Sequence, residues 1–230
     1  MKRMKKILTL AVVLMTTLAL FAQEEKDVTK FLGIPVDGYK SEMISKLKAK
    51  GFTETNIDGC LEGIFNNYPV LITVNINPYN NKVYEISLLD IAENSESEIR
   101  YRFNNLISQF ENNSNYIGGT NEYISEEEDL GHNIANREKI YQAIFFQESG
   151  SINKEIDYVM WEKYGVKGPE DLPEEEKKEA SEYLQNYINN YIKNRLSKKR
   201  VTFFIIPRDK KYHISMSYTN CYNEPNGEDL

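Results

Sequence analysis

The sequence of 230 residues predicts an α+β protein of two similar halves, each a helix followed by antiparallel strands, with a helical hairpin inserted in the second half. Apolar residues change from a helical period to a strand period after Lys50, and the same order of patterns begins again at Ser95. A long helical stretch then interrupts the strands of the second half. The expected parts are a leader (1–22), a first half (23–93) and a second half (94–230) with an insertion at about 150–200.

The leader has the features of a secretory signal peptide. It starts with four cations: Lys2, Arg3, Lys5 and Lys6. An uncharged apolar run then ends at Phe21, and Ala22 is a small residue at the expected cleavage point. The run is shorter than the roughly 20 residues that span a bilayer, although an uncleaved anchor is the alternative. A lipid anchor would need a cysteine at the cleavage point, but the first cysteine is Cys60. We therefore expect a periplasmic or secreted protein with no stable membrane span.

The first half should contain one helix and a hairpin. The helix is expected from Ser41 to about Lys50, where Gly51 can take the left-handed conformation that ends helices. Apolar and polar residues alternate from Val70 to Ile76 and again from Tyr84 to Leu88, on either side of a turn at 78–81. Weaker strand patterns cover 52–55 and 60–65. One apolar sheet face packed against the helix is the natural arrangement.

The second half begins with a helix whose first turn is marked by Ser95 and Glu98, at the spacing of a capping box. Its apolar residues recur at helical spacing: Ile99, Phe103, Leu106, Ile107 and Phe110. Strands are expected at 139–148, 201–207 and 212–219. The insertion should hold one helix at about 153–164 and another from about Asp171 to Leu196, with acidic residues at the start of the second and basic residues at its end.

Two short segments resemble a known group of proteins. They are Phe31 to Gly38 (FLGIPVDG) and Lys46 to Phe52 (KLKAKGF), together with the tail from Asn226 to Leu230. The chain thereby resembles small exported, functionally uncharacterised proteins of Bacteroidetes, with an architecture similar to β-lactamase-inhibitor-like α+β folds. The resemblance implies an exported α+β domain and no catalytic residue, and inhibition of an enzyme would follow from fold analogy alone.

Charge and cysteine content restrict the function classes. Cleavage of the leader leaves 24 Lys and Arg against 35 Asp and Glu, a net charge of −11. This balance opposes binding to a phosphate backbone, so we expect no nucleic-acid partner. Cys60 and Cys221 are the only thiols. They can either form one disulfide in an oxidising compartment or remain buried free thiols.

Candidate catalytic and metal sites are weak. The acidic run Glu126 to Asp129 lies near His132, but its spacing matches no zinc or EF-hand signature, so a solvated loop explains it better. His213 shares a strand face with Ser215 and Ser217, without a nucleophile elbow, and is expected to face solvent. We expect no cofactor, and an enzyme is the less favoured class.

Aromatic residues of the insertion are the strongest candidate contacts. They are Tyr158 and Trp161 on the first inserted helix and Tyr183, Tyr187 and Tyr191 on the second. They can pack on one another or form a contact surface, since Tyr and Trp combine large apolar area with a polar group. The function favoured by the sequence is a non-catalytic binding module for a protein or glycan of the envelope or the extracellular space. The alternatives are a secreted hydrolase of cell-envelope or dietary polymers and a proteinaceous enzyme inhibitor.

Overall fold

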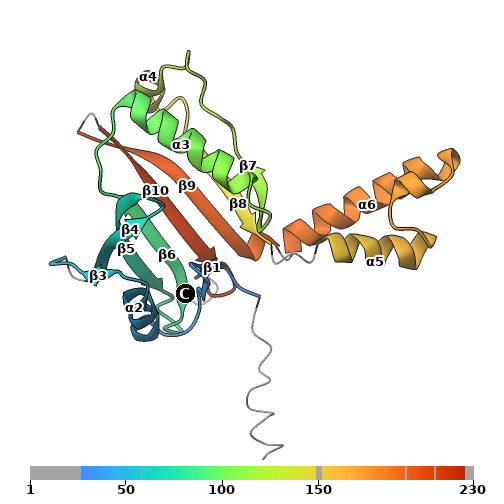
Figure 1. Cartoon of the computed structure of the whole chain (residues 1–230), viewed down its shortest axis with the longest axis horizontal. Helices are drawn as coiled ribbons and strands as arrows, with labels where there is room; N and C mark the ends of the chain where they lie inside the picture. The colour runs from blue at the N-terminus through green and yellow to red at the C-terminus, as the bar shows by residue number, and fades with distance from the viewer. Residues whose placement is uncertain (1–26, 58, 149–151, 195, 210, 226–230) are drawn as a thin grey trace, which may run out of the picture.

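The computed structural model describes residues 27–57, 59–148, 152–194, 196–209 and 211–225, and the predicted leader lies outside them. The fold is α+β, as predicted: an eight-stranded antiparallel sheet in the order β3-β4-β5-β6-β10-β9-β8-β7, a two-stranded sheet β1-β2, and helices (Figure 1). The strands are β1 (Lys30–Phe31), β2 (Ile34–Pro35), β3 (Thr53–Glu54), β4 (Cys60–Phe65), β5 (Tyr68–Ile76), β6 (Val83–Asp90), β7 (Tyr116–Thr120), β8 (Gln142–Gln147), β9 (Lys199–Arg208) and β10 (Lys211–Asn220). The α-helices are α2 (Lys40–Ala49), α3 (Glu96–Glu111), α4 (Leu130–Ala135), α5 (Ile152–Tyr164) and α6 (Glu174–Asn194).

One face of the large sheet carries the core. Residues in the central parts of β5, β6 and β9 alternate between buried and half-buried, as the alternating sequence pattern predicts, whereas the last three residues of β10 are all buried. Helix α2 contacts β5, and α3 contacts β7, β9 and β10. The similarity of the two halves stays a prediction.

The sheet curls toward this helix-covered face. Strands β4 and β10 are separated by β5 and β6, which in a flat sheet would place them about 14 Å apart. The ring centroids of Phe65 on β4 and Tyr218 on β10 are nevertheless only 6.3 Å apart. Phe31 of β1 lies between them, with its ring 5.3 Å from Phe65 and 4.9 Å from Tyr218. The β1-β2 hairpin therefore fills the inside of a curled sheet.

Helix α3, the first helix of the predicted second half, is tied to strands of the first half. Its first turn has the capping box that the sequence predicts, with Ser95 and Glu98 each bonding the other's backbone. Arg102 is 1% exposed, and its Nε donates a 3.1 Å hydrogen bond to Asp90 at the end of β6. The guanidinium also lies 3.7 Å above the ring of Tyr68 at the start of β5. One buried cation thus fixes the helix of the second half to strands of the first.

Helices α5 and α6 form an arm that extends away from the sheet, on the right of Figure 1. The arm leaves the body after β8 and rejoins it at β9. It has a small core of its own, made of Met160, Leu172 and Ala180 with half-buried neighbours such as Leu184. Helix α6 starts at Glu174 rather than near Asp171, which belongs to a preceding 3₁₀ turn.

Both cysteines are free, so the disulfide alternative is wrong in this structure. Cys60 lies on β4 and Cys221 follows β10, with two strands between them, whereas a disulfide needs Cα atoms within about 7 Å. Both side chains are half-buried. Burial raises the pKa of the Cys221 thiol to about 11, which keeps it protonated at neutral pH.

Candidate functional site at the mouth of the curled sheet

Two adjoining cavities open at one end of the curled sheet, and we call them together the mouth. They share the lining residues Leu32, Phe65, Asn113, Tyr116 and Tyr218. The polar cavity, about 510 Å³, adds Asp27, Val28, Lys30, Gly33, Asn115, Gln147, Glu148 and Lys199. The apolar cavity, about 300 Å³, adds Ile64, Asn66, Leu106, Gln109 and Phe110. The mouth is thus assembled from the β1-β2 hairpin, the β4-β5 turn, the end of α3 and the ends of β8 and β9. Ligand sites are common at the mouths of curved and closed sheets.

The turn of the β1-β2 hairpin presents an apolar side chain to both cavities. Leu32 and Gly33 connect the paired residues Phe31 and Ile34, and both have positive φ, at 50° and 80°. This two-residue turn suits Asn-Gly far better than Leu-Gly, because a leucine in the left-handed region is disfavoured by about 1 kcal/mol or more. Leu32 is nevertheless 41% exposed, so burial in the core does not explain its presence. Strain and exposure together indicate a residue placed for contact.

The opposite rim is the β4-β5 turn. Asn66 and Asn67 also have positive φ, which asparagine tolerates well. The Asn66 Nδ2 donates a 2.8 Å hydrogen bond to Oε1 of Gln109 on α3. This contact holds the turn beside the end of the helix. Ile64, next to the turn, is 66% exposed and adds a second accessible apolar side chain to the rim.

Two tyrosines, Tyr116 and Tyr218, line both cavities and carry neutral hydroxyl groups. Burial is the main cause that raises the pKa of Tyr218 well above 10 and also raises the pKa of Tyr116. Both phenols therefore keep their protons at neutral pH. The Gln147 Nε2 donates to the Tyr116 hydroxyl at 3.1 Å, and the same amide exchanges two hydrogen bonds with the backbone of Lys30, at 2.6 and 3.0 Å. The Gln147 amide therefore connects the Tyr116 phenol to the β1-β2 hairpin through hydrogen bonds.

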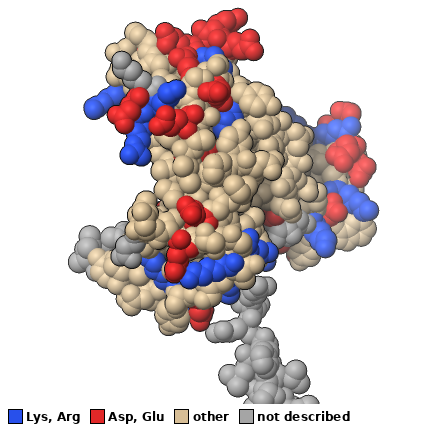
Figure 2. All heavy atoms as spheres, turned by 60° about the vertical axis from the view of Figure 1, so that its left-hand side comes forward, with Lys and Arg blue, Asp and Glu red and all other residues tan. Residues whose placement is uncertain are grey.

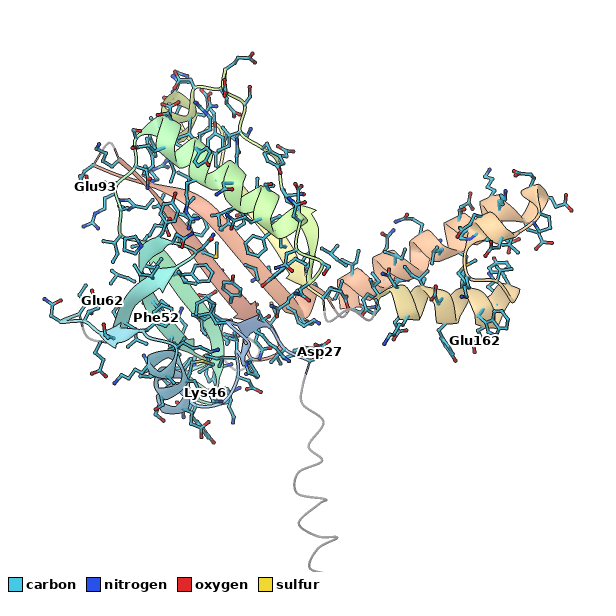
Figure 3. The ribbon with its side chains drawn as sticks, in the orientation of Figure 1. Asp27, Lys46, Phe52, Glu62, Glu93 and Glu162 are labelled. Atoms are coloured by element: carbon cyan, nitrogen blue, oxygen red, sulfur yellow. The ribbon has the colours of Figure 1, made fainter. Side chains whose placement is uncertain are left out.

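The polar cavity contains a paired buried cation. The side chain of Lys199 is 2% exposed, and its Nζ lies 2.8 Å from Oδ2 of Asp27. Figure 3 shows Asp27, the first described residue of the chain, at the side of the body that faces the arm. Glu148, also buried, lines the same cavity. Among the described residues, the charged side chains that line the cavity are two cations and two anions, so their charges sum to zero.

The structure separates the aromatic residues that the sequence selected into two groups. Tyr158 and Trp161 are 61% and 64% exposed on the outer side of α5, where they line a shallow hollow with Lys154, Asp157 and Lys167. Figure 3 labels Glu162, their neighbour on the arm, far from the mouth. The two aromatic rings are accessible but belong to a different part of the molecule.

The tyrosines of α6 are partly packed within the arm. The ring centroids of Tyr183 and Tyr164 are 5.9 Å apart, the Tyr187 hydroxyl donates a 3.0 Å hydrogen bond to Glu155, and Tyr191 is 9% exposed. These three side chains are therefore not brought together with Tyr158 and Trp161 on one surface.

Groups expected from catalytic or metal chemistry do not converge within the described ranges. No cluster of three metal-ligating side chains occurs there. His213 is buried rather than solvent-facing: β10 pairs with β6, and the His213 Nδ1 lies 3.0 Å from the carbonyl oxygen of Asp90 at the end of β6. In the acidic run, Glu128 is bonded by Lys139 and Tyr141, at 2.8 and 2.7 Å. A search of the described helices for one long and apolar enough to cross a bilayer finds none.

No residue of the mouth was predicted from the sequence as a site residue. A signal was present at Leu32-Gly33, where a two-residue turn between apolar neighbours carries leucine instead of asparagine. The other lining residues come from segments that are far apart in the chain, and a lone sequence contains no sign that they meet. Comparison of the chain with protein-family models, curated proteins and solved structures finds no match.

Proposed function

We propose that this chain is an exported, non-catalytic binding module that contacts its ligand or partner at the mouth. The observation that carries the proposal is Leu32, an exposed leucine held in a strained left-handed turn between two cavities. Asparagine would stabilise this turn better than leucine. The apolar side chain at this position therefore indicates a role in recognition.

The composition of the mouth supports binding rather than hydrolysis. Its accessible groups are aromatic rings, aliphatic side chains, amides and neutral hydroxyls, together with the charged side chains of Lys30 and Asp27. Its buried Lys199 is paired with Asp27. A general acid or base would need a carboxyl or imidazole with a pKa moved toward neutrality, and the raised pKa values in the mouth belong to tyrosines.

Figure 2 shows how charge is distributed on one face of the molecule. Charged side chains gather at the upper and lower ends of this face and on the arm, and a band of mostly uncharged residues lies between them. Strong electrostatic steering of a partner to this face would need charge of one sign along it.

The proposal is tested with a matched pair of variants. Leu32→Asn keeps a residue suited to the turn and removes the apolar contact, and Ile140→Asn removes an exposed apolar side chain outside the mouth. Envelope extract of the source cells is passed over each immobilised protein, and retained proteins and small molecules are quantified by mass spectrometry. Leu32→Asn should lower retention of a specific species by about tenfold or more, whereas Ile140→Asn should not. Equal retention by both variants contradicts the proposal.

The outer side of α5 is a second candidate surface. Tyr158 and Trp161 are both more than half exposed, and tryptophan and tyrosine are enriched at binding hot spots. A Tyr158→Ser/Trp161→Ser variant in the same retention assay separates this surface from the mouth. Loss of retention in that variant alone would transfer the binding function to the arm.

A further inference from the structure

The two cavities of the mouth have different chemistry, which restricts the ligand. None of the described side chains that line the apolar cavity is charged. Its inner wall consists of buried Leu106 and Phe110 with Tyr218, and its outer rim of the exposed Leu32 and Ile64. An aliphatic group placed there would lose contact with water on several sides. The favourable free energy would grow with each methylene buried.

The polar cavity next to it selects against a net charge. Lys30 and Lys199 are balanced by Asp27 and Glu148. A ligand with one uncompensated charge would lose hydration without gaining a counter-charge, which is unfavourable in a partly enclosed site. An uncharged head with hydroxyl or carbonyl oxygens avoids this cost. The amides of Asn113 and Asn115 offer both donors and acceptors to such a head.

The groups at the boundary suit the junction between head and chain. Tyr116 and Tyr218 line both cavities, and burial raises the pKa of each, so each hydroxyl keeps its proton. An ester carbonyl or an alcohol at the junction can accept a hydrogen bond from a phenol.

The size of the apolar cavity sets the length of the chain. Its volume, about 300 Å³, corresponds to roughly ten water molecules. A chain of about eight carbons has similar bulk. Deepening the proposed function, on which this inference rests, we propose that the mouth binds a neutral amphiphile, with a medium-length acyl chain in the apolar cavity and an uncharged polyol head in the polar cavity.

Isothermal titration calorimetry of the purified protein tests the proposal with four probes, each kept below its micellar concentration. They are 1-octanoylglycerol, 1-hexanoylglycerol, octanoate and glycerol. Octanoylglycerol should bind at one site. Hexanoylglycerol should bind about fifteenfold more weakly, because it lacks two methylenes. Octanoate should bind at least tenfold more weakly because of its charge, and glycerol should show no heat.

Octanoate binding as tightly as octanoylglycerol would overturn the neutral-head inference, and equal affinity for both acyl lengths would overturn the placement of the chain.

Variants locate the binding site. Leu32→Asn and Ile64→Thr should each weaken octanoylglycerol binding by about tenfold, and Ile140→Thr should leave it unchanged. Unchanged affinity in the first two variants would place the amphiphile elsewhere and overturn the proposal.

A fifth probe, N-acetyl-leucine amide, distinguishes an apolar peptide side chain from an acyl chain. The parent protein could bind N-acetyl-leucine amide but not octanoylglycerol, with the amide binding lost in Leu32→Asn. This result would overturn the proposal that the mouth binds an amphiphile and would leave the proposed function intact. If the proposed function itself fails, retention from envelope extract will also be insensitive to Leu32→Asn.

Discussion

The body and the arm of this protein are stabilised in different ways. The body has one contiguous core that joins residues from β1 to β10, whereas the arm has three buried core residues and half-buried neighbours. The exposed aromatic residues that the sequence selected lie on the arm, whereas an exposed leucine with positive φ lies at the mouth of the body. The segment that is selected from its aromatic residues therefore differs from the segment that we propose for binding from its backbone geometry.

The largest effect is expected for Arg102→Met in the body. This variant leaves Asp90 buried without its counter-ion, so the free energy of unfolding should fall by about 3 to 5 kcal/mol. Chemical denaturation measures the change. An Arg102→Met/Asp90→Asn variant should recover most of it, because no unpaired charge remains. A loss of less than 1 kcal/mol would show that Arg102 does not fix α3 to the sheet.

The same variant has a defined pH dependence. Burial raises the pKa of Asp90, and the hydrogen bond and charge of Arg102 oppose that rise. Without Arg102 the pKa of folded Asp90 should increase further. A carboxyl whose pKa is higher in the folded than in the unfolded protein loses stability as the pH rises through that interval. The difference in free energy of unfolding between Arg102→Met and the parent should therefore be greatest at neutral pH and shrink toward pH 4. A constant or growing difference would contradict this account.

A smaller and local effect is expected for Tyr191→Ser in the arm. Tyr191 is 9% exposed, so its loss should destabilise the arm by about 2 to 3 kcal/mol. Hydrogen exchange should become faster in α5 and α6 and stay unchanged in β5, β6, β9 and β10. Tyr158→Ser, at an exposed position of the same hairpin, is the matched control and should change exchange little. Faster exchange throughout the sheet would show that the arm and body unfold together.

A gain in stability is expected for Leu32→Asn. Asparagine fits the left-handed turn, so the free energy of unfolding should rise by about 1 kcal/mol and Tm by about 2 to 4 °C, while ligand retention falls. Leu32→Ala should lose retention without this gain, because alanine has no side-chain amide to support the turn. Thermal unfolding gives the comparison. Lower stability of Leu32→Asn would mean that Leu32 serves the fold.

Regular elements of the fold were predictable, because their signals are local. The alternation of Val70, Ile72 and Val74 set the buried face of β5, and the Ser95–Glu98 spacing marked the start of α3. Strand β7 was missed because its centre, Gly118-Gly119, has no apolar period. The curl of the sheet depends on contacts such as Phe65 with Tyr218, which are far apart in sequence. The mouth follows from that curl, so its residues could not be grouped in advance.

Cross-linking at two positions tests the central claim most directly. A photo-reactive side chain is placed at Leu32 in the mouth or at Trp161 on the arm, and the protein is irradiated in its source cells. The account predicts a defined adduct from position 32, to a protein or a small molecule, and none of that species from position 161. A defined adduct from position 161 with none from position 32 would contradict the account and assign binding to the arm.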